Sequence, residues 1–309
     1  MSSLQAPSTV PASPNSIRVS PRHLGQMRRA DFSPHCFWHS IALGFRHPFD
    51  MPMPGIMFNM DGFQKKLIQA HFDTKGVAPK WLASLGCTEP VSFPAKMTME
   101  FPKYGLTLVG MPDGLFRKKD GTLYLVDYKT ARYKGADDPF MPGYETQLWG
   151  YAQLLEHHHI GTVTSAAIVY FENTLTDFAT KPLDLLTNDG MQVPFKVRIH
   201  EVAIDRGAIE PLMKAYRMYA DMAKPPEEND GCKTCERLKV LFDAENGARG
   251  NAKAIKGLEN KDTATLNYII QVAAANRREA RARQSFGWED SLADSVDEDI
   301  DCIPADWDL

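Results

Sequence analysis

Residues 97–130 constrain the fold of this chain more than any other segment. Three runs rich in β-forming residues occur there: M-T-M-E-F, L-T-L-V-G-M and T-L-Y-L-V-D-Y-K-T. They are separated by P-K-Y-G and by K-K-D-G, and the dipeptide Asp120-Gly121 in the second separator is a strong signal for a β-hairpin. The segment therefore predicts short strands joined by tight turns.

Helical patterns lie on both sides of these strands. Ser20-Pro21 and Pro34 provide typical helix starts, and apolar residues recur at helical spacing in several later segments. The expected helices cover about 20–29, 34–45, 56–72, 144–156, 206–223 and 263–283, and further strands cover about 162–171 and 192–202. This order predicts an α/β domain with a mixed, partly antiparallel sheet flanked by helices, and with helical N-terminal and C-terminal additions.

Composition changes along the chain predict four parts. Residues 1–19 are rich in Ser and Pro and are expected to be disordered. Residues 20–240 form the predicted central domain, which ends with a C-x-x-C pair. Residues 241–288 are predicted to be a helical extension, and residues 289–309 an acidic disordered tail.

The composition of the 309 residues excludes several classes of protein. The longest apolar stretches are far shorter than the roughly 20 residues that cross a bilayer, so no membrane segment is expected. The N-terminus lacks the basic start and apolar core of a secretory signal. Five cysteines are too few for a disulfide scaffold and favour a reducing, cytoplasmic setting, where spaced cysteines more often bind metal.

The net charge of −4 conceals an uneven distribution of charge. Residues 289–309 contain nine acidic residues and no Lys or Arg, which leaves 35 basic against 30 acidic residues in the remainder, or about +5. A mildly basic body permits a polyanionic partner without requiring one.

The strongest chemical signal lies at the ends of two predicted strands. G-M-P-D-G ends one strand at Asp113, and V-D-Y-K-T ends the next with Asp127 and Lys129. Strands joined by a hairpin bring their ends together, and Asp127 and Lys129, two apart in a strand, project to the same face. Two carboxylates suit Mg²⁺ or Mn²⁺, and a nearby lysine can orient water or stabilise charge on phosphate. Each of these charged residues alone is more often a solvated side chain at a strand end. Their combination indicates catalysis.

The order G-x-x-D, hydrophobic-D-x-K-T and Q-x-x-x-Y resembles the PD-(D/E)xK nuclease superfamily in its RecB-like branch, which includes CRISPR-associated exonucleases. The resemblance covers about residues 20–236 and is most specific in residues 110–155. It implies a restriction-endonuclease-like core. It also implies that Asp113 and Asp127 bind metal together with the backbone carbonyl of Tyr128, and that Lys129 acts on the attacking water. Gln147 and Tyr151, at i and i+4 of a helix, would line the DNA path.

One family position differs in this chain. RecB-like members often carry a metal-binding histidine in a G-x-x-x-H setting on an early helix, whereas Lys66 stands four residues after Gly62 here. Asp61 is a candidate substitute acid, although helix periodicity does not decide the matter.

The cysteines form a second candidate site. The resemblance places Cys36 before the core and Cys232 and Cys235 after it, as part of an iron–sulfur cluster, while Leu241 replaces the usual fourth cysteine. A C-x-x-C pair also suits Zn²⁺. His35, His39 or Cys87 could complete either site, and the alternative is that the pair is a vestige without metal.

These features predict a metal-dependent DNA nuclease, an exonuclease, that hydrolyses phosphodiester bonds in a pathway such as DNA repair, recombination, phage replication or CRISPR adaptation. The alternatives are a catalytically inactive nucleic-acid-binding or scaffold protein on the same fold and an RNA-directed nuclease. The tail is interpreted as a disordered, solubilising end. Ile303, Trp307 and Leu309 are more than such a tail requires, so the alternatives are that it docks on a protein partner or covers the chain's own DNA channel.

Overall fold

The computed structural model describes residues 16–45, 54–177, 181–240, 242 and 243. The chain divides into two compact units, and each is considered by itself. The described residues up to Glu227 belong to the first unit. The second unit contributes the described residues from 228 on, which include a helix over residues 233–240. The predicted acidic tail, and the predicted helical extension apart from residues 242 and 243, lie outside the described residues.

The first described residues form a strand and two capped helices. These are β1 (Ile17–Val19), α1 (Pro21–Gln26) and α2 (Pro34–Ala42). The hydroxyl of Ser20 accepts a hydrogen bond from the backbone N–H of His23, and Ser33 caps α2 in the same way through Cys36. Both predicted helix starts are thus confirmed. The prediction that residues 1–19 are disordered is wrong for residues 17–19, which form β1. Val19 is fully buried there, and β1 pairs in parallel with a later strand.

A five-stranded sheet forms the centre of the first unit, with the strand order β10-β7-β6-β5-β2. Only β6 and β7 pair in parallel, and the other neighbours are antiparallel, so the sheet is mixed as predicted. In chain order the strands are β2 (Cys87–Pro90), β5 (Gly114–Lys118), β6 (Leu123–Lys129), β7 (Val163–Asn173) and β10 (Phe195–Val202).

A smaller sheet is built from β1, β4 and β3. Strands β3 (Met97–Phe101) and β4 (Leu106–Gly110) form a hairpin around the short 3₁₀ helix η1 (Pro102–Tyr104). A further excursion between β7 and β10 contains η2 (Pro182–Leu185), β8 (Leu186–Thr187) and β9 (Gly190–Met191).

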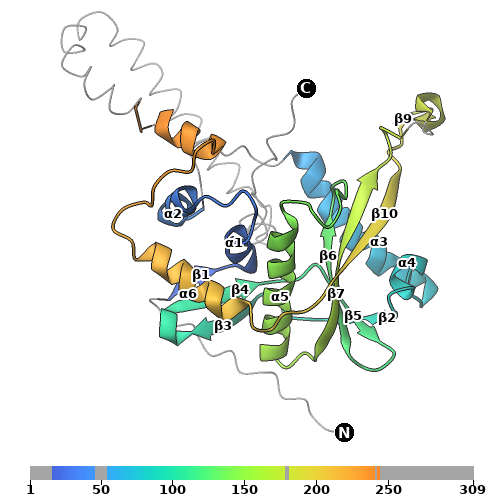
Figure 1. Ribbon diagram of the computed structural model, residues 1–309. Coiled ribbons are helices and arrows are strands. Elements are labelled where there is room, and N and C mark those ends of the chain that lie inside the picture. The colour runs from blue at the N-terminus through green and yellow to red at the C-terminus, as the bar shows by residue number, and fades with distance from the viewer. Residues whose placement is uncertain (1–15, 46–53, 178–180, 241, 244–309) are drawn as a thin grey trace, which may run out of the picture. The chain divides into compact units, whose positions relative to one another are not determined.

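Helices cover both faces of the five-stranded sheet. On one face α5 (Met141–His157) packs on β6 and β7, with α6 (Ile209–Ala220) beside it. On the other face lie α3 (Gly55–Lys75) and α4 (Lys80–Ala83). Two apolar clusters result, one around Leu148 of α5 and one around Ile68 of α3. Figure 1 shows α5 and α3 on opposite sides of the strands.

Two glycines, Gly25 of α1 and Gly150 of α5, allow α1 to pack closely against α5. A Cβ atom on Gly25 would lie 2.6 Å from the carbonyl oxygen of Gly143, and one on Gly150 would lie 2.5 Å from Cβ of Pro21. Larger residues at these points would force the two helices apart. The N-terminal helix is therefore fixed against the helix that carries Gln147 and Tyr151.

Several short strands were missed by the sequence analysis, and one of them, β5, changes how the two carboxylates meet. Residues 114–118 form β5, which pairs with β6 in the hairpin at Asp120-Gly121. Asp113 therefore precedes β5 and does not end a strand that is joined to β6, since β4 belongs to the smaller sheet. The run Pro112-Asp113-Gly114 hid this boundary, because Pro and Gly mark turns and left only a five-residue strand behind them. Among the residues that the structure describes, no helix has the length and apolar character needed to cross a bilayer.

Candidate active site

The two predicted metal-binding carboxylates come together at the end of β6. Gly114 of β5 pairs with Val126 of β6, so Asp113 and Asp127 are held at the same end of the hairpin. The backbone N–H of Tyr128 donates a hydrogen bond to Oδ2 of Asp113 at 2.9 Å. This bond fixes the Asp113 carboxylate against the backbone that carries Asp127.

Asp127 is the buried member of the pair, with 2% of its surface exposed. Its Oδ2 lies 3.0 Å from Nζ of Lys129, yet it has no well-directed hydrogen bond from any described residue. Burial raises the pKa of Asp127 to about 6; the charge of Asp113 adds to this rise and Lys129 opposes it. A buried acceptor without a directed donor is costly, and such acceptors are often found where a ligand or ion binds.

Lys129 is held in place by residues of α5. Its Nζ donates a hydrogen bond to Oε1 of Gln147 at 3.3 Å and lies 4.9 Å from the centre of the Tyr144 ring. Burial lowers the pKa of Lys129, but Asp127, Tyr144 and Asp113 together outweigh burial, and the net pKa is raised. Lys129 therefore stays protonated at neutral pH and acts as a fixed positive charge.

Gln147 and Tyr151 are joined directly, as their i and i+4 spacing predicted. Nε2 of Gln147 donates a hydrogen bond to the hydroxyl oxygen of Tyr151 at 3.0 Å. Space for the Tyr151 ring comes from Gly110, where a Cβ atom would lie only 2.7 Å from Cε1 of the ring. The predicted residues Asp113, Asp127, Lys129, Gln147 and Tyr151 thus form one connected cluster.

Lys65 of α3 is a member of this cluster that the sequence analysis missed. Its Nζ lies 2.8 Å from Oδ1 of Asp113 and 2.9 Å from Oδ2 of Asp61. Burial lowers the pKa of Lys65, but the charges and hydrogen bonds of Asp113 and Asp61 outweigh it and raise the net pKa. Asp61 reaches the site through this lysine, and its role as a metal ligand stays a prediction. The i, i+4 spacing of Asp61 and Lys65 was the available signal, but it commonly marks an ordinary surface pair.

The donor set fits a hard divalent cation. Asp113 and Asp127 provide two carboxylates from adjacent strand ends, and both are compensated by ammonium groups, Lys65 and Lys129. Oδ2 of Asp127 is buried and open to a further partner. Oxygen ligands of this kind, with positions left for water, are typical of Mg²⁺ and Mn²⁺ sites.

The pattern of the PD-(D/E)XK nuclease superfamily matches residues 64–240, more than half of the chain and the whole of this cluster apart from Asp61. The chain belongs to the PD-(D/E)XK nuclease superfamily. No curated protein matches it at a significant level.

Solved structures similar to this PD-(D/E)XK chain include two exonucleases. A phage-related exonuclease from Haemophilus somnus 129PT has 14% identity and a TM-score of 0.37, with 67% of this chain and 94% of that chain covered. An alkaline exonuclease (LHK-Exo) from Laribacter hongkongensis has 12% identity and a TM-score of 0.33, with 77% of this chain and 94% of that chain covered. The superfamily match over residues 64–240 and the mixed sheet flanked by helices described above bear out the predicted restriction-endonuclease-like fold.

The predicted cysteine site involves both units of the chain. Cys36 lies on α2 of the first unit, whereas Cys232 and Cys235 lie at the start of the helix in the second unit. A metal site shared by these three residues therefore stays a prediction. Cys87 is a poor fourth ligand, since it is buried in the apolar cluster around Ile68 and burial raises the pKa of its thiol to about 12.

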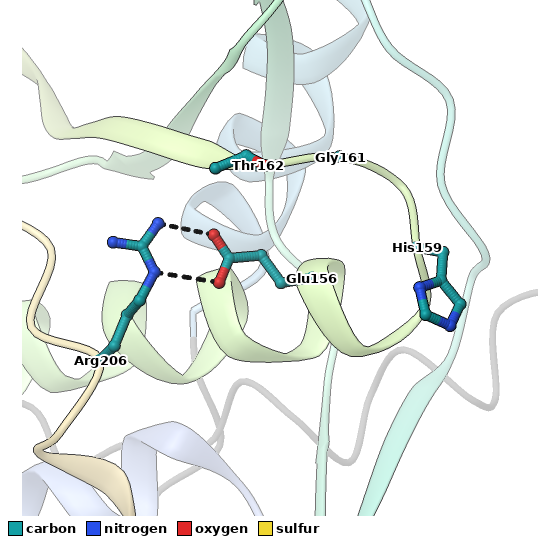
Figure 2. Close-up of a pocket in the computed structure, with 5 residues that line it drawn as sticks. All are labelled: Glu156, His159, Gly161, Thr162 and Arg206. Carbon is teal, nitrogen blue, oxygen red and sulfur yellow. Dashed lines mark hydrogen bonds and ion pairs between the residues drawn. The ribbon is translucent and has the colours of Figure 1, made fainter.

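A hollow of about 500 Å³ lies at the other end of α5, away from the carboxylates. It is lined by Glu156, His159, Gly161, Thr162 and Arg206 (Figure 2). The guanidinium of Arg206 binds the carboxylate of Glu156 through two contacts of 2.7 and 3.1 Å and also donates to the carbonyl of Val163 at 2.8 Å. These contacts join α5 to the start of β7, so the charged residues that line the hollow have a structural role.

Proposed function

We propose that this PD-(D/E)XK nuclease is a metal-dependent deoxyribonuclease of the RecB-like branch that acts as an exonuclease. The observation that supports this most strongly is the cluster at the end of β6. Asp113, Asp127 and Lys129 lie together there, and a buried oxygen of Asp127 remains open to a ligand. A member of the fold that had become only a binding module would have little reason to retain this costly arrangement.

The proposed roles follow from the contacts. Asp113 and Asp127, with the backbone carbonyl of Tyr128, would hold Mg²⁺ or Mn²⁺. A bound divalent ion supplies water activation and neutralisation of charge on the leaving oxygen. Lys129, fixed by Gln147 and by Asp127, would orient water and stabilise negative charge on the phosphate. Gln147 and Tyr151 would line the path of the DNA strand.

The cysteines carry a separate proposal, an iron–sulfur cluster or Zn²⁺ bound by Cys36, Cys232 and Cys235. Elemental analysis of the purified protein, together with absorbance in the visible range, distinguishes iron, zinc and an empty site. A protein without either metal would contradict this proposal and would leave the nuclease proposal untouched.

The central experiment incubates the full chain with linear and circular DNA, single-stranded and double-stranded, in Mg²⁺, Mn²⁺ or EDTA. We expect degradation of linear DNA in the presence of either ion and none in EDTA. Cleavage of circular DNA would replace the exonuclease proposal with an endonuclease. Matched RNA substrates test the RNA-directed alternative, and binding without cleavage under every condition would indicate an inactive binding protein.

A further inference from the structure

A row of three side chains crosses the sheet beside the carboxylates. Tyr170 of β7 is the register partner of Lys129 on β6 and of Arg198 on β10. Direct cross-strand neighbours project to the same face of a sheet. Lys129 contacts Gln147 of α5, so the row faces α5 and begins inside the proposed active site.

The hydroxyl group of Tyr170 has no hydrogen-bond partner among the residues that the structure describes, although the residue is only 1% exposed. Its ring packs 5.2 Å from the ring of Tyr133, whose hydroxyl bonds to Nδ1 of His200 at 3.0 Å instead. A buried hydroxyl without a partner costs free energy, and buried polar groups in proteins are nearly always paired. The group therefore requires an explanation.

The surroundings of Tyr170 favour a hydrogen-bond donor. Burial raises the pKa of its hydroxyl, and the neighbouring groups Tyr144, Asp138 and Asp127 raise it further, so the proton is retained. The available proton lies in the same row as the ammonium group of Lys129 and the guanidinium of Arg198. Strands lie about 4.8 Å apart, so the row extends roughly 10 Å from Lys129 to Arg198.

We propose that Tyr170 is a substrate-binding residue, whose hydroxyl donates a hydrogen bond to a phosphate oxygen of a nucleic-acid strand that runs from Lys129 toward Arg198. This inference rests on the proposed nuclease function and extends it to a residue outside the superfamily motif. Phosphate is the preferred ligand because Lys129 and Arg198, both cations, hold the register positions on either side of Tyr170. Arg198 is 59% exposed and is paired with Glu172 at 3.5 Å, so it can turn toward a strand at the rim of the site.

The test uses Tyr170→Phe, which removes only the oxygen atom. The probe is a short fluorescein-labelled single-stranded DNA, bound to the full chain in EDTA so that it is not cleaved. We expect Kd to rise about tenfold, the loss typical of a hydrogen bond to a charged group. The melting temperature should be unchanged or higher, because the variant no longer buries an unpaired hydroxyl.

Tyr124→Phe is the matched control. Tyr124 is an equally buried tyrosine of β6, but it lies in the apolar cluster around Ile68, and its hydroxyl is 3.3 Å from Oε2 of Glu201. This variant should melt at a lower temperature and bind the oligonucleotide with unchanged Kd. Arg198→Gln should weaken binding and reduce the salt dependence of Kd by about one counterion.

Two results would overturn the inference: a wild-type Kd for Tyr170→Phe, or a weaker Kd accompanied by the same loss of melting temperature as in Tyr124→Phe. The second result would identify the hydroxyl as structural. Failure of the nuclease proposal is recognised separately. If the wild-type chain binds the oligonucleotide through Tyr170 but never cleaves DNA, the Tyr170 proposal stands and the nuclease proposal is wrong. If the chain neither binds nor cleaves DNA, both proposals are wrong.

Discussion

The two halves of α5 are each associated with a cluster of opposite charges, and the two clusters differ in how complete they are. Near its C-terminus, Glu156 and Arg206 satisfy each other, and both also bond to the backbone of Val163. Near its N-terminal half, Lys129 and Lys65 balance Asp127 and Asp113, but the most buried carboxylate oxygen has no directed donor. The first cluster completes its own bonding, while the second leaves an acceptor available.

An acceptor without a directed donor distinguishes a binding site from a structural ion pair more clearly than the presence of a hollow does. The Glu156–Arg206 cluster lies in a hollow, and its side chains are 27% and 52% exposed. Asp127 is almost completely buried. Keeping charge out of water without full compensation costs stability, so the second cluster indicates selection for something other than folding. Substitutions at the two ends of α5 test this interpretation.

The largest effect is expected from the carboxylate cluster. Asp113→Ala, Asp127→Ala and Lys129→Ala should each lower the cleavage rate by at least roughly 10²-fold, because each removes a transition-state interaction. DNA binding should largely survive in Lys129→Ala. Initial rates on linear DNA in Mn²⁺ provide the measurement, and cleavage by the Asp127 variant at the wild-type rate would remove the assignment.

The second prediction concerns pH and the metal-free protein. The pKa of Asp127 is about 6 in the folded chain and 3.8 as a free side chain, so between these values the native state binds more protons than the unfolded state. The contribution of Asp127 to stability is therefore fully present below about pH 4 and is lost as pH rises through 6, by up to roughly 3 kcal/mol.

Urea unfolding in EDTA from pH 4 to pH 7 measures this change. The difference between wild type and Asp127→Asn reports the titration of Asp127 together with that of the charged groups in contact with it, because titrating residues remote from the site contribute equally to both proteins. A difference that does not vary with pH would mean that the pKa of Asp127 is the same in the folded and unfolded chains.

The third prediction concerns Lys65, which occupies Oδ1 of Asp113. Lys65→Met should leave that oxygen available and strengthen Mn²⁺ binding roughly fivefold, which corresponds to about 1 kcal/mol for a partly exposed ion pair. The rise in melting temperature on adding Mn²⁺ should therefore be larger in the variant than in the wild type. Lys66→Met, at the exposed neighbouring position, is the control and should match the wild type.

The smallest effect is expected from the complete ion pair at the other end of α5. Arg206→Ala should lower the free energy of unfolding by about 1 kcal/mol, since the pair is half exposed and screened by water. Cleavage by this variant should equal that of the wild type. A substantial loss of cleavage without a loss of stability would show that the hollow contributes to function after all.

Local sequence patterns predicted much of this architecture. The caps at Ser20 and Ser33, the hairpin at Asp120-Gly121 and the helical stripe that contains Gln147 all reflect interactions within a few residues. The motif also placed Asp127 and Lys129 on one side of a strand. Strand β5 was missed because its boundary is a turn sequence. Without β5, the sequence analysis wrongly placed Asp113 at the end of the strand that precedes β6 in the hairpin.

Lys65 and Tyr170 could not be found from sequence, for two different physical reasons. Lys65 reaches Asp113 from a helix 48 positions earlier, and a lysine four residues after an aspartate is usually an exposed pair. Tyr170 sits in an apolar strand where an aromatic residue is ordinary core. Only the register of β7 against β6 and β10 shows that its hydroxyl belongs to a row of charged neighbours.

The glycine contacts between α1 and α5 have a practical consequence for anyone who wishes to shorten this protein. The recognisable superfamily pattern begins at residue 64, yet the helix bearing Gln147 is clamped by Pro21 and Gly25. Truncation at the border of the pattern would remove Pro21 and Gly25 and would expose Gly143 and Gly150 of α5 to water. The superfamily pattern therefore begins later in the chain than the residues that hold α5 in place. A shortened version of the enzyme has to begin ahead of β1.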